Sequence, residues 1–332
     1  MIRFGIVGFG LHAVRRLMPG FAKAKNCRVT ALSRRNLEEA KASAKQHNIP
    51  LAFDSALELA RSREVDAVLV TTPNACHVND VLVALSCGKP VLVEKPMGMS
   101  AAECRQMVDA AHRAKQLLGV AQVFRFEDST AKFRDRLTKG EIGRPVFAAS
   151  EFSYQGRRHA RKWINDLAIS GGGPIADVGV HCIDALRFIL QDDIVRVSAR
   201  TISDPESKDV ESAAVLALEF SSGALGSVLV STRAEYRTLL EVVGETGVLR
   251  ADDALNVEYP IRIELRRGGK VVESEEVFNQ LAYARQVDAF ADALEGKCEF
   301  PVPGEEGLKN QLVLDAAYKS ARTGRADDVG TI

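Results

Sequence analysis

The first 121 residues alternate short β-branched runs with segments of helical periodicity, and this order constrains the fold more than any other feature. Strands that alternate with helices of crossover length form parallel sheets with helices on both faces. Ser100 and Glu103 have the spacing of a capping box, which predicts a helix over residues 101–117. The strand-like runs are residues 2–7, 28–32, 65–71, 90–93 and 118–123. We therefore predict a doubly wound parallel sheet over residues 1–121.

Beyond residue 121 the predicted strands follow one another, mostly through short turns that contain Gly or Asp, which favours antiparallel pairing. Strands are expected at residues 146–153, 195–201, 213–220, 225–231, 239–243, 261–266 and 271–276. A short helix is expected to end near residue 139. Further helices are expected over residues 174–190, 280–294 and 305–321. A chain of 332 residues also exceeds the usual size of a single core. We predict two α/β domains, residues 1–121 and 122–332, the second with a large, open, mostly antiparallel sheet.

Composition argues against several classes of protein. The chain has 44 basic and 44 acidic residues, so no net charge favours nucleic acid as a partner. Its six cysteines are scattered without metal-ligand spacing, which predicts reduced thiols, no metal and a cytoplasmic protein. No apolar run reaches about 18 residues and no signal sequence opens the chain, so neither a membrane span nor secretion is expected.

A glycine-rich turn follows the first predicted strand and opens a helix. The turn consists of Gly8, Phe9, Gly10, Leu11, His12 and Ala13, which gives the pattern G-x-G-x-x-A. Glycines let the backbone turn tightly and approach a pyrophosphate, which then faces helix N–H groups. The pattern predicts a dinucleotide site, and the alternative is a tight strand-to-helix turn without a ligand.

The end of the second strand indicates which dinucleotide binds. NAD sites place an acid there for the ribose 2′-hydroxyl, but this chain has Ser33, Arg34 and Arg35. A serine hydroxyl and a guanidinium can bind a 2′-phosphate. NADP is therefore favoured over NAD, which stays possible, and the alternative is that both arginines are solvated charges at a helix start.

Two more groups stand at predicted strand ends, where parallel sheets bind ligands. The first comprises Thr71, Thr72, Pro73 and Asn74, with His77 following. His77 either faces the cofactor or makes only local hydrogen bonds at a helix start. The second comprises Glu94, Lys95 and Pro96. Lys95 can stabilise an oxygen that becomes an alkoxide, with Glu94 holding its ammonium, or the two form an ion pair at a strand end.

Asp177 and His181 lie four residues apart behind the glycine run 171–173 and would share one face of a helix that begins near Pro174. An imidazole can remove a hydroxyl proton near neutral pH. Asp177 could orient His181 or bind a substrate hydroxyl, and Asp184 could support the second ring nitrogen. The alternative is a buried, hydrogen-bonded histidine between two acids on the helix surface.

The basic run 157–162 ends beside Trp163. It forms either a solvated loop or a contact with an acidic or phosphorylated substrate, in which Trp163 supplies a flat wall for a ring. Tyr154 and Arg125 are further candidates for contact with the substrate, and Arg125 for contact with the cofactor. Strands 213–218 and 228–230 are continuously apolar and need cover on both faces, which predicts a homodimer or homotetramer.

Together these motifs resemble the Gfo/Idh/MocA family, which includes glucose–fructose oxidoreductase and inositol dehydrogenase. The resemblance covers nearly the whole chain and rests on residues 8–13, 72–77, 94–96 and 171–181. It implies an N-terminal Rossmann domain and a C-terminal α/β domain whose open sheet often packs against another subunit. Two departures are Ala13 in place of the last glycine and Val123 in place of an asparagine near Arg125.

The resemblance implies that Lys95, Asp177 and His181 take the positions of the family's catalytic residues, with His181 as the acid or base. Family substrates are mostly sugars and cyclitols, and some members act on dihydrodiols, imines or nucleotide sugars. The sequence thus predicts an NAD(P)-dependent dehydrogenase or reductase that acts on a CH–OH group in carbohydrate metabolism. The alternatives are a non-catalytic dinucleotide sensor of the same fold and a structural subunit that binds no cofactor.

Overall fold

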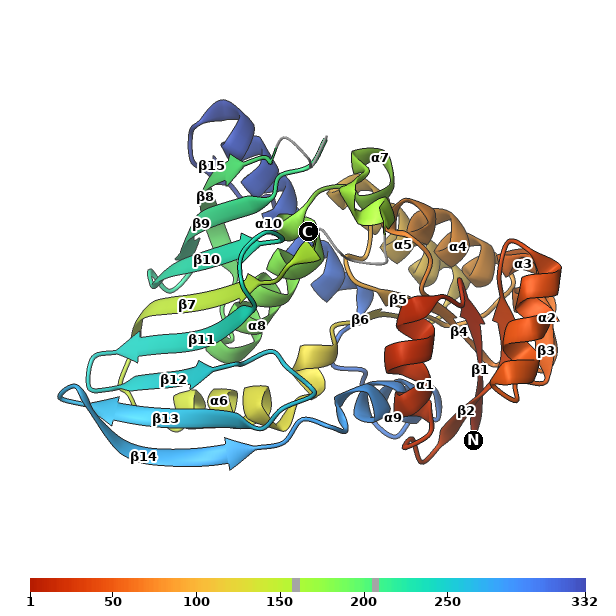
Figure 1. Cartoon of the computed structure of the whole chain (residues 1–332), viewed down its shortest axis with the longest axis horizontal. Coiled ribbons are helices and arrows are strands. Elements are labelled where there is room, and N and C mark those ends of the chain that lie inside the picture. The colour runs from red at the N-terminus through yellow and green to blue at the C-terminus, as the bar shows by residue number, and fades with distance from the viewer. Residues whose placement is uncertain (157–161, 205–208) are drawn as a thin grey trace. The chain divides into compact units, whose positions relative to one another are not determined.

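The computed structural model describes residues 1–156, 162–204 and 209–332 (Figure 1). The chain packs into two compact units. The first unit combines residues 1–122 with residues 283–308, and the second combines residues 123–282 with residues 309–332. The division predicted after residue 121 did not include this return of residues 283–308 to the first unit.

The first unit contains a six-stranded sheet in the order β3-β2-β1-β4-β5-β6, in which every neighbouring pair is parallel. The strands are β1 Ile2–Val7, β2 Cys27–Ser33, β3 Leu51–Phe53, β4 Ala67–Val70, β5 Val91–Glu94 and β6 Leu118–Ala121. The helices are the π-helix η1 Ala13–Leu17, α1 Met18–Phe21, α2 Leu37–Gln46, α3 Ala56–Arg61, α4 Asn74–Ser86, α5 Ala101–Ala114 and α9 Ala282–Leu294. The predicted doubly wound sheet is confirmed, with β3 as an edge strand that was not predicted.

Local signals set the ends of helix α5. The Ser100 side chain accepts a hydrogen bond from the Glu103 N–H at 3.3 Å, and the Glu103 carboxylate accepts one from the Met99 N–H at 2.8 Å. The capping box is therefore present, although its glutamate accepts from the N–H of Met99 rather than from that of Ser100, the N-cap residue. The helix ends at Ala114 rather than at residue 117 because Lys115 has the left-handed conformation, with φ of 53°.

The second unit contains a nine-stranded sheet in the order β14-β13-β12-β11-β7-β10-β9-β8-β15. Only β7 and β10 pair in parallel, and the other pairs are antiparallel. The strands are β7 Pro145–Ser153, β8 Ile194–Ile202, β9 Ala213–Phe220, β10 Leu225–Ser231, β11 Arg237–Gly244, β12 Val248–Asp252, β13 Ile261–Arg267, β14 Lys270–Val277 and β15 Asp327–Asp328. The predicted open, mostly antiparallel sheet is confirmed, with β12 and β15 as strands that were not predicted.

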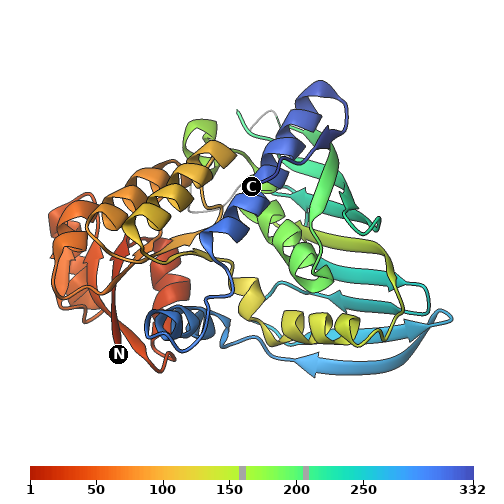
Figure 2. The same ribbon diagram turned by 180° about the vertical axis from the view of Figure 1, so that it is seen from behind.

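Helices cover one face of this sheet, which Figure 2 shows from the side of α6 and α8. All helical segments of this unit are η2 Val123–Phe126, α6 Asp128–Thr138, η4 Lys162–Asn165, α7 Leu167–Ser170, the π-helix η5 Ile175–Gly179, α8 Val180–Leu190 and most of α10 Gly304–Thr323, and α6 and α8 lie on the covered face. Side chains alternate along β9, so Leu216 and Leu218 are buried while Val215 on the other face is 53% exposed. The core of the unit therefore lies between the sheet and its helices.

In the part of the chain that the structure describes, no helix has both the length and the apolar character needed to cross a membrane.

Candidate functional site

The glycine turn of the first unit leaves room for a ligand at one of its two glycines. Gly8 has φ of +83°, and a Cβ there would lie 2.6 Å from Thr72 Cγ2, so the fold itself requires this glycine. A Cβ on Gly10 would meet only the Gly8 carbonyl oxygen, at 3.6 Å, an ordinary contact. Packing therefore does not explain Gly10, whereas close approach of a dinucleotide does, and this favours the ligand over an empty turn.

The end of β2 has two arginines in different surroundings. Arg34 donates to Ser43 Oγ at 2.9 Å and to the Glu39 carboxylate at 2.7 Å. Ser33 is buried, with 3% of its surface exposed, while Arg35 is exposed. Arg35 therefore has the guanidinium more readily available to a 2′-phosphate, and Glu39 competes with any such phosphate for Arg34.

The predicted group after β4 mostly binds the chain itself. Thr71 Oγ1 donates toward the Val7 and Gly8 carbonyls at 3.1 and 2.9 Å, which holds the glycine turn. Thr72 Oγ1 donates to Asp80 at 2.8 Å. Pro73 precedes helix α4, whose first residue, Asn74, is buried.

His77 lies in the interior of the first unit, with 1% of its surface exposed. Its Nδ1 lies 3.0 Å from the Pro96 carbonyl oxygen and its Nε2 lies 2.8 Å from the Thr72 carbonyl oxygen. The ring thus joins the loop after β4 to the loop after β5, and its contacts are not only local. Burial lowers the pKa of His77, while both backbone carbonyls oppose that effect.

Glu94 pairs with His12 of the glycine turn, a contact that the sequence did not predict. His12 Nε2 lies 2.8 Å from Glu94 Oε1, and the Lys95 backbone N–H donates to Glu94 Oε2 at 3.3 Å. Burial by itself raises the pKa of Glu94, but the charge and hydrogen bond of His12 and the charge of Lys95 outweigh it, so the pKa lies below its ordinary value. The Glu94 carboxylate thus holds His12 of the glycine turn, while the nearby Lys95 charge also favours its ionised form, so a role of Glu94 in holding the Lys95 ammonium stays a prediction.

In the second unit, the predicted helix after Pro174 forms and begins with a wide turn. Residues 175–179 are a π-helix and residues 180–190 continue as the α-helix α8. Asp177 lies in the wide turn and His181 in the following α-turn, and each is 8% exposed. Single π-turns occur often at functional sites, and here the turn carries the predicted acid.

Tyr154 at the end of β7 is the partner of Asp177. Its hydroxyl donates to Asp177 Oδ2 at 2.5 Å, which unites two residues predicted separately. The His181 ring lies 4.6 Å from the Phe124 ring, centroid to centroid, and is stacked on Phe152 at 6.5 Å. Neighbouring turns of one helix thus present the Asp177 carboxylate and the His181 imidazole, and the end of β7 supplies the phenol that binds the carboxylate. Such a set can transfer a proton and can pack against the apolar face of a ring.

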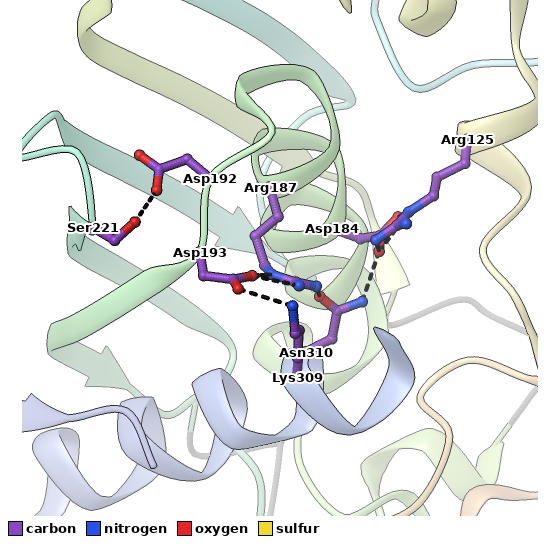
Figure 3. Close-up of polar contacts among 8 residues, drawn as sticks. All are labelled: Arg125, Asp184, Arg187, Asp192, Asp193, Ser221, Lys309 and Asn310. Carbon is purple, nitrogen blue, oxygen red and sulfur yellow. Dashed lines mark hydrogen bonds and ion pairs between the residues drawn. The ribbon is translucent and has the colours of Figure 1, made fainter. Parts of the chain in front are cut away.

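Asp184 and Arg125 form a buried ion pair (Figure 3). Arg125 Nη2 donates to Asp184 Oδ1 at 2.7 Å, and Asn310 Nδ2 donates to the same oxygen at 2.7 Å. The role suggested for Asp184, support of the second ring nitrogen of His181, is therefore corrected, because α8 directs its carboxylate to Arg125 and Asn310. Arg125 is engaged in the same pair, with 6% of its side chain exposed, so its predicted contacts with cofactor and substrate have no support from this geometry.

The same network continues to the end of α8. Arg187 donates to Asn310 Oδ1 and to Asp193 at 2.7 Å each, and Lys309 donates to Asp193 at 2.9 Å. Figure 3 shows that these contacts join α8 to α10. The second half of the helix that carries His181 is thus held to α10 by polar contacts, of which those among Arg125, Asp184, Arg187 and Asn310 are buried.

Most of the basic run, residues 157–161, lies outside the described residues. Lys162 and Trp163 begin the helical turn η4, where Lys162 is exposed and Trp163 is partly buried. A substrate contact for Trp163 stays a prediction. Among the residues that the structure describes, no group of three or more His, Cys, Asp or Glu side chains is placed to hold a metal ion.

Two family models match the chain. The model of an oxidoreductase family with an NAD-binding Rossmann fold matches residues 2–122, and the model of the GFO/IDH/MocA C-terminal domain matches residues 130–250. A D-xylose 1-dehydrogenase (NADP(+)) of Haloferax volcanii is 32% identical, over 97% of this chain and 98% of its own length. A 1,5-anhydro-D-fructose reductase of Ensifer adhaerens is 30% identical, over 100% of this chain and 99% of its own length.

A solved structure agrees with these matches. The aldose-aldose oxidoreductase from Caulobacter crescentus, crystallised with glycerol, superposes with a TM-score of 0.90. It is 26% identical, and the match covers 98% of this chain and 99% of that one. The similarity therefore extends over both units of the chain.

Proposed function

Because this chain belongs to the Gfo/Idh/MocA family of oxidoreductases, we propose that it interconverts a secondary alcohol or hemiacetal and the corresponding carbonyl on a small polyhydroxylated substrate. The observation that carries this proposal is the helix 175–190, which presents Asp177, bound by the Tyr154 hydroxyl, one turn before His181. Sugar substrates are supported by the relatives, which are named as a xylose dehydrogenase and an anhydrofructose reductase.

The residues of the first unit fit a nicotinamide dinucleotide. Gly10 leaves its Cβ position open, and the helix that begins directly after it, at residue 11, has the N-terminal N–H groups that would receive a pyrophosphate. When bound, the nicotinamide supplies or accepts the hydride of the reaction. We propose NADP as the preferred form, with NAD possible, because β2 ends in Ser33, Arg34 and Arg35 without an acid.

Each side chain has a proposed part in the chemistry. In the oxidative direction the His181 imidazole takes the proton of the substrate hydroxyl, and in the reductive direction it returns that proton. The Lys95 ammonium stabilises the oxygen while negative charge develops on it. Asp177, held by the Tyr154 hydroxyl, orients a substrate hydroxyl or the imidazole. The aromatic rings of Phe124 and Phe152 exclude water from one side of His181.

A substrate screen tests this function. The purified protein is mixed with NADP⁺ or NAD⁺ and a panel of aldoses, inositols and sugar acids, and reduced nicotinamide is followed by its absorbance. NADPH binding is measured on the same preparation by fluorescence. Turnover of at least one hydroxy compound is expected. Binding without turnover would favour a dinucleotide sensor, and the absence of binding would favour a structural subunit.

A further inference from the structure

Two side chains from distant segments close the start of the helix that carries Asp177 and His181. Glu211, which precedes β9, accepts hydrogen bonds from the Gly173 and Ile175 N–H groups at 3.0 Å each, one on each carboxylate oxygen. Tyr318 of α10 donates its hydroxyl to Glu211 Oε1 at 3.0 Å. We call Glu211 and Tyr318 the helix clamp. The amides at a helix start have no partner within the helix, and here the clamp supplies one.

The glycine run explains how the clamp fits. A Cβ on Gly172 would lie 1.8 Å from the Tyr318 hydroxyl oxygen, and a Cβ on Gly173 would lie 2.0 Å from the Glu211 carbonyl oxygen. No side chain could occupy either position without moving the clamp. The two glycines are therefore required by close approach of the clamp, and the helix start is filled by a protein carboxylate rather than open to a ligand.

The clamp holds the first residues of the π-turn. Ile175, whose N–H binds Glu211, begins the turn, and the Asp177 N–H donates to the Gly173 carbonyl at 3.0 Å. A wide turn places successive side chains at different angles about the helix axis than an α-turn does. Anchoring its start therefore fixes the direction in which Asp177 leaves the helix, and hence its bond to Tyr154.

The carboxylate of the clamp is itself in an unusual setting. Glu211 is 8% exposed. Burial raises its pKa, while the Gly173 and Ile175 N–H groups and the Tyr318 hydroxyl act against that effect. The positive end of the helix dipole stabilises its charge as well. Burial also raises the pKa of Tyr318, with the nearby Glu211 charge as the next cause, so its hydroxyl stays protonated and able to donate.

We propose that Glu211 and Tyr318 are positioning residues for the reaction, because they set the π-turn that aims Asp177 at Tyr154 and places His181. The proposal rests on the proposed function, since it assigns these residues to the same site. Under this proposal neither residue touches the reacting atoms. Their effect passes through the backbone of residues 173–177.

Variants of the clamp test the proposal. Tyr318→Phe removes only the hydroxyl, Glu211→Gln keeps the shape of the side chain, and Glu211→Ala removes it. We expect Glu211→Ala and Tyr318→Phe to lower kcat by about 10-fold to 100-fold, the scale of a small misplacement of reacting groups. Glu211→Gln should retain more activity than Glu211→Ala. NADPH affinity should stay unchanged, because the proposed cofactor site lies in the first unit. Amide hydrogen exchange should accelerate in residues 171–181.

Matched controls are Glu276→Gln and Tyr259→Phe, whose side chains are exposed in the second unit and should leave all these quantities unchanged. If folded Glu211→Ala and Tyr318→Phe keep the kcat and exchange rates of the natural protein, the proposal is overturned. Faster exchange with unchanged kcat would also overturn it, because the clamp would then be only structural. A natural protein without turnover refutes the proposed function instead, and the exchange rates still report whether the clamp holds the turn.

Discussion

A catalytic role and a purely structural role of His181 predict different effects when the residue is replaced. Its ring packs against Phe124 and Phe152, so a purely structural role would lower stability when it is removed. If it transfers the proton, His181→Asn should lower kcat by about 100-fold to 10,000-fold, with NADPH affinity nearly unchanged. Steady-state kinetics, NADPH titration and melting temperature on one preparation separate the two roles. A folded variant with near-normal turnover would remove His181 from the mechanism.

The two arginines after β2 differ in what they can offer a phosphate. Arg35 is exposed, whereas Arg34 is already bonded to Glu39 and Ser43. Arg35→Ala and Arg34→Ala should each weaken NADPH more than NADH, by on the order of 1 to 3 kcal/mol for a lost charge-assisted contact, with the larger effect at Arg35. Isothermal titration with both cofactors measures this difference. Equal weakening of NADPH and NADH by both variants would contradict the NADP assignment.

Glu127 makes the stability of the protein depend on pH. It is 1% exposed, its Oε1 has no hydrogen-bond partner among the described residues, and burial raises its pKa well above the ordinary value despite the Thr130 and Ser129 hydroxyls. The folded state therefore binds more protons than the unfolded state at pH values between the two pKa values. The free energy of unfolding consequently falls as pH rises from about 4.3, the value for an unfolded chain, toward the folded pKa.

Glu127→Gln should remove this dependence, because an amide does not titrate. Between pH 5 and pH 8 the melting temperature of the natural protein should fall relative to that of Glu127→Gln. Glu38→Gln, at a side chain that is 82% exposed, is the control and should follow the natural protein. If plots of melting temperature against pH are parallel for all three proteins across this range, Glu127 does not titrate as we infer.

At the scale of elements, the Arg125–Asp184 pair joins η2 to α8. Asp184→Asn leaves the Arg125 guanidinium buried without its counter-charge, which should lower the free energy of unfolding by about 3 to 5 kcal/mol. Asp192 at the end of α8 is the control, because it binds Ser221 near the surface and its loss should cost no more than about 1.5 kcal/mol. Urea denaturation measures both changes. Equal losses at Asp184 and Asp192 would contradict the importance of the buried pair.

Elements with a strong local pattern could be predicted from the sequence. The strands and helices of the first unit follow from buried β-branched runs and capping residues such as Ser100. Strand β12 was missed because Val248–Asp252 is only five residues long and carries the charged residues Arg250 and Asp252. The burial of Leu249 and Ala251 on one face is visible only once β11 and β13 flank the strand. Propensity is weak over so short a segment, and tertiary pairing decides it.

The candidate site shows the same limit. The spacing of Asp177 and His181 placed them on one helix, but it did not predict the π-turn between them. The bonds Tyr154–Asp177 and His12–Glu94 join residues 23 and 82 positions apart, and no local signal relates their members. Sequence spacing therefore identified the candidate catalytic side chains, while their partners depend on which strands and loops become neighbours.

At the scale of the whole molecule, we propose that the open face of the nine-stranded sheet meets another copy of this chain. Val215 and Leu229 are cross-strand partners on that face and are 53% and 39% exposed. Leu225 and Phe147, also partners, are 47% and 52% exposed. Contiguous exposed apolar side chains of this kind mark interaction surfaces.

Introducing a charged side chain on the open face of the sheet tests the oligomer prediction. Leu229→Lys should shift a homodimer or homotetramer toward a smaller species, because a lysine opposite an apolar surface would be desolvated without a partner. Light scattering at micromolar concentration measures the mass of the natural protein and of the variant. Leu57→Lys, on α3 of the first unit, is the control. A natural protein that is already monomeric would refute the proposal.

The return of residues 283–308 to the first unit has a consequence for synthesis. Phe290 packs on Phe4 with ring centroids 6.0 Å apart, and Phe300 fills the space above Gly119, where a Cβ would lie 2.5 Å from its ring. When the ribosome has made only the first 122 residues, the six strands are present but these aromatic rings are not. The core of the first unit therefore stays partly uncovered while every strand of the nine-stranded sheet except β15 is translated. The first unit can complete its folding only when residues 283–308 have been made, near the end of synthesis.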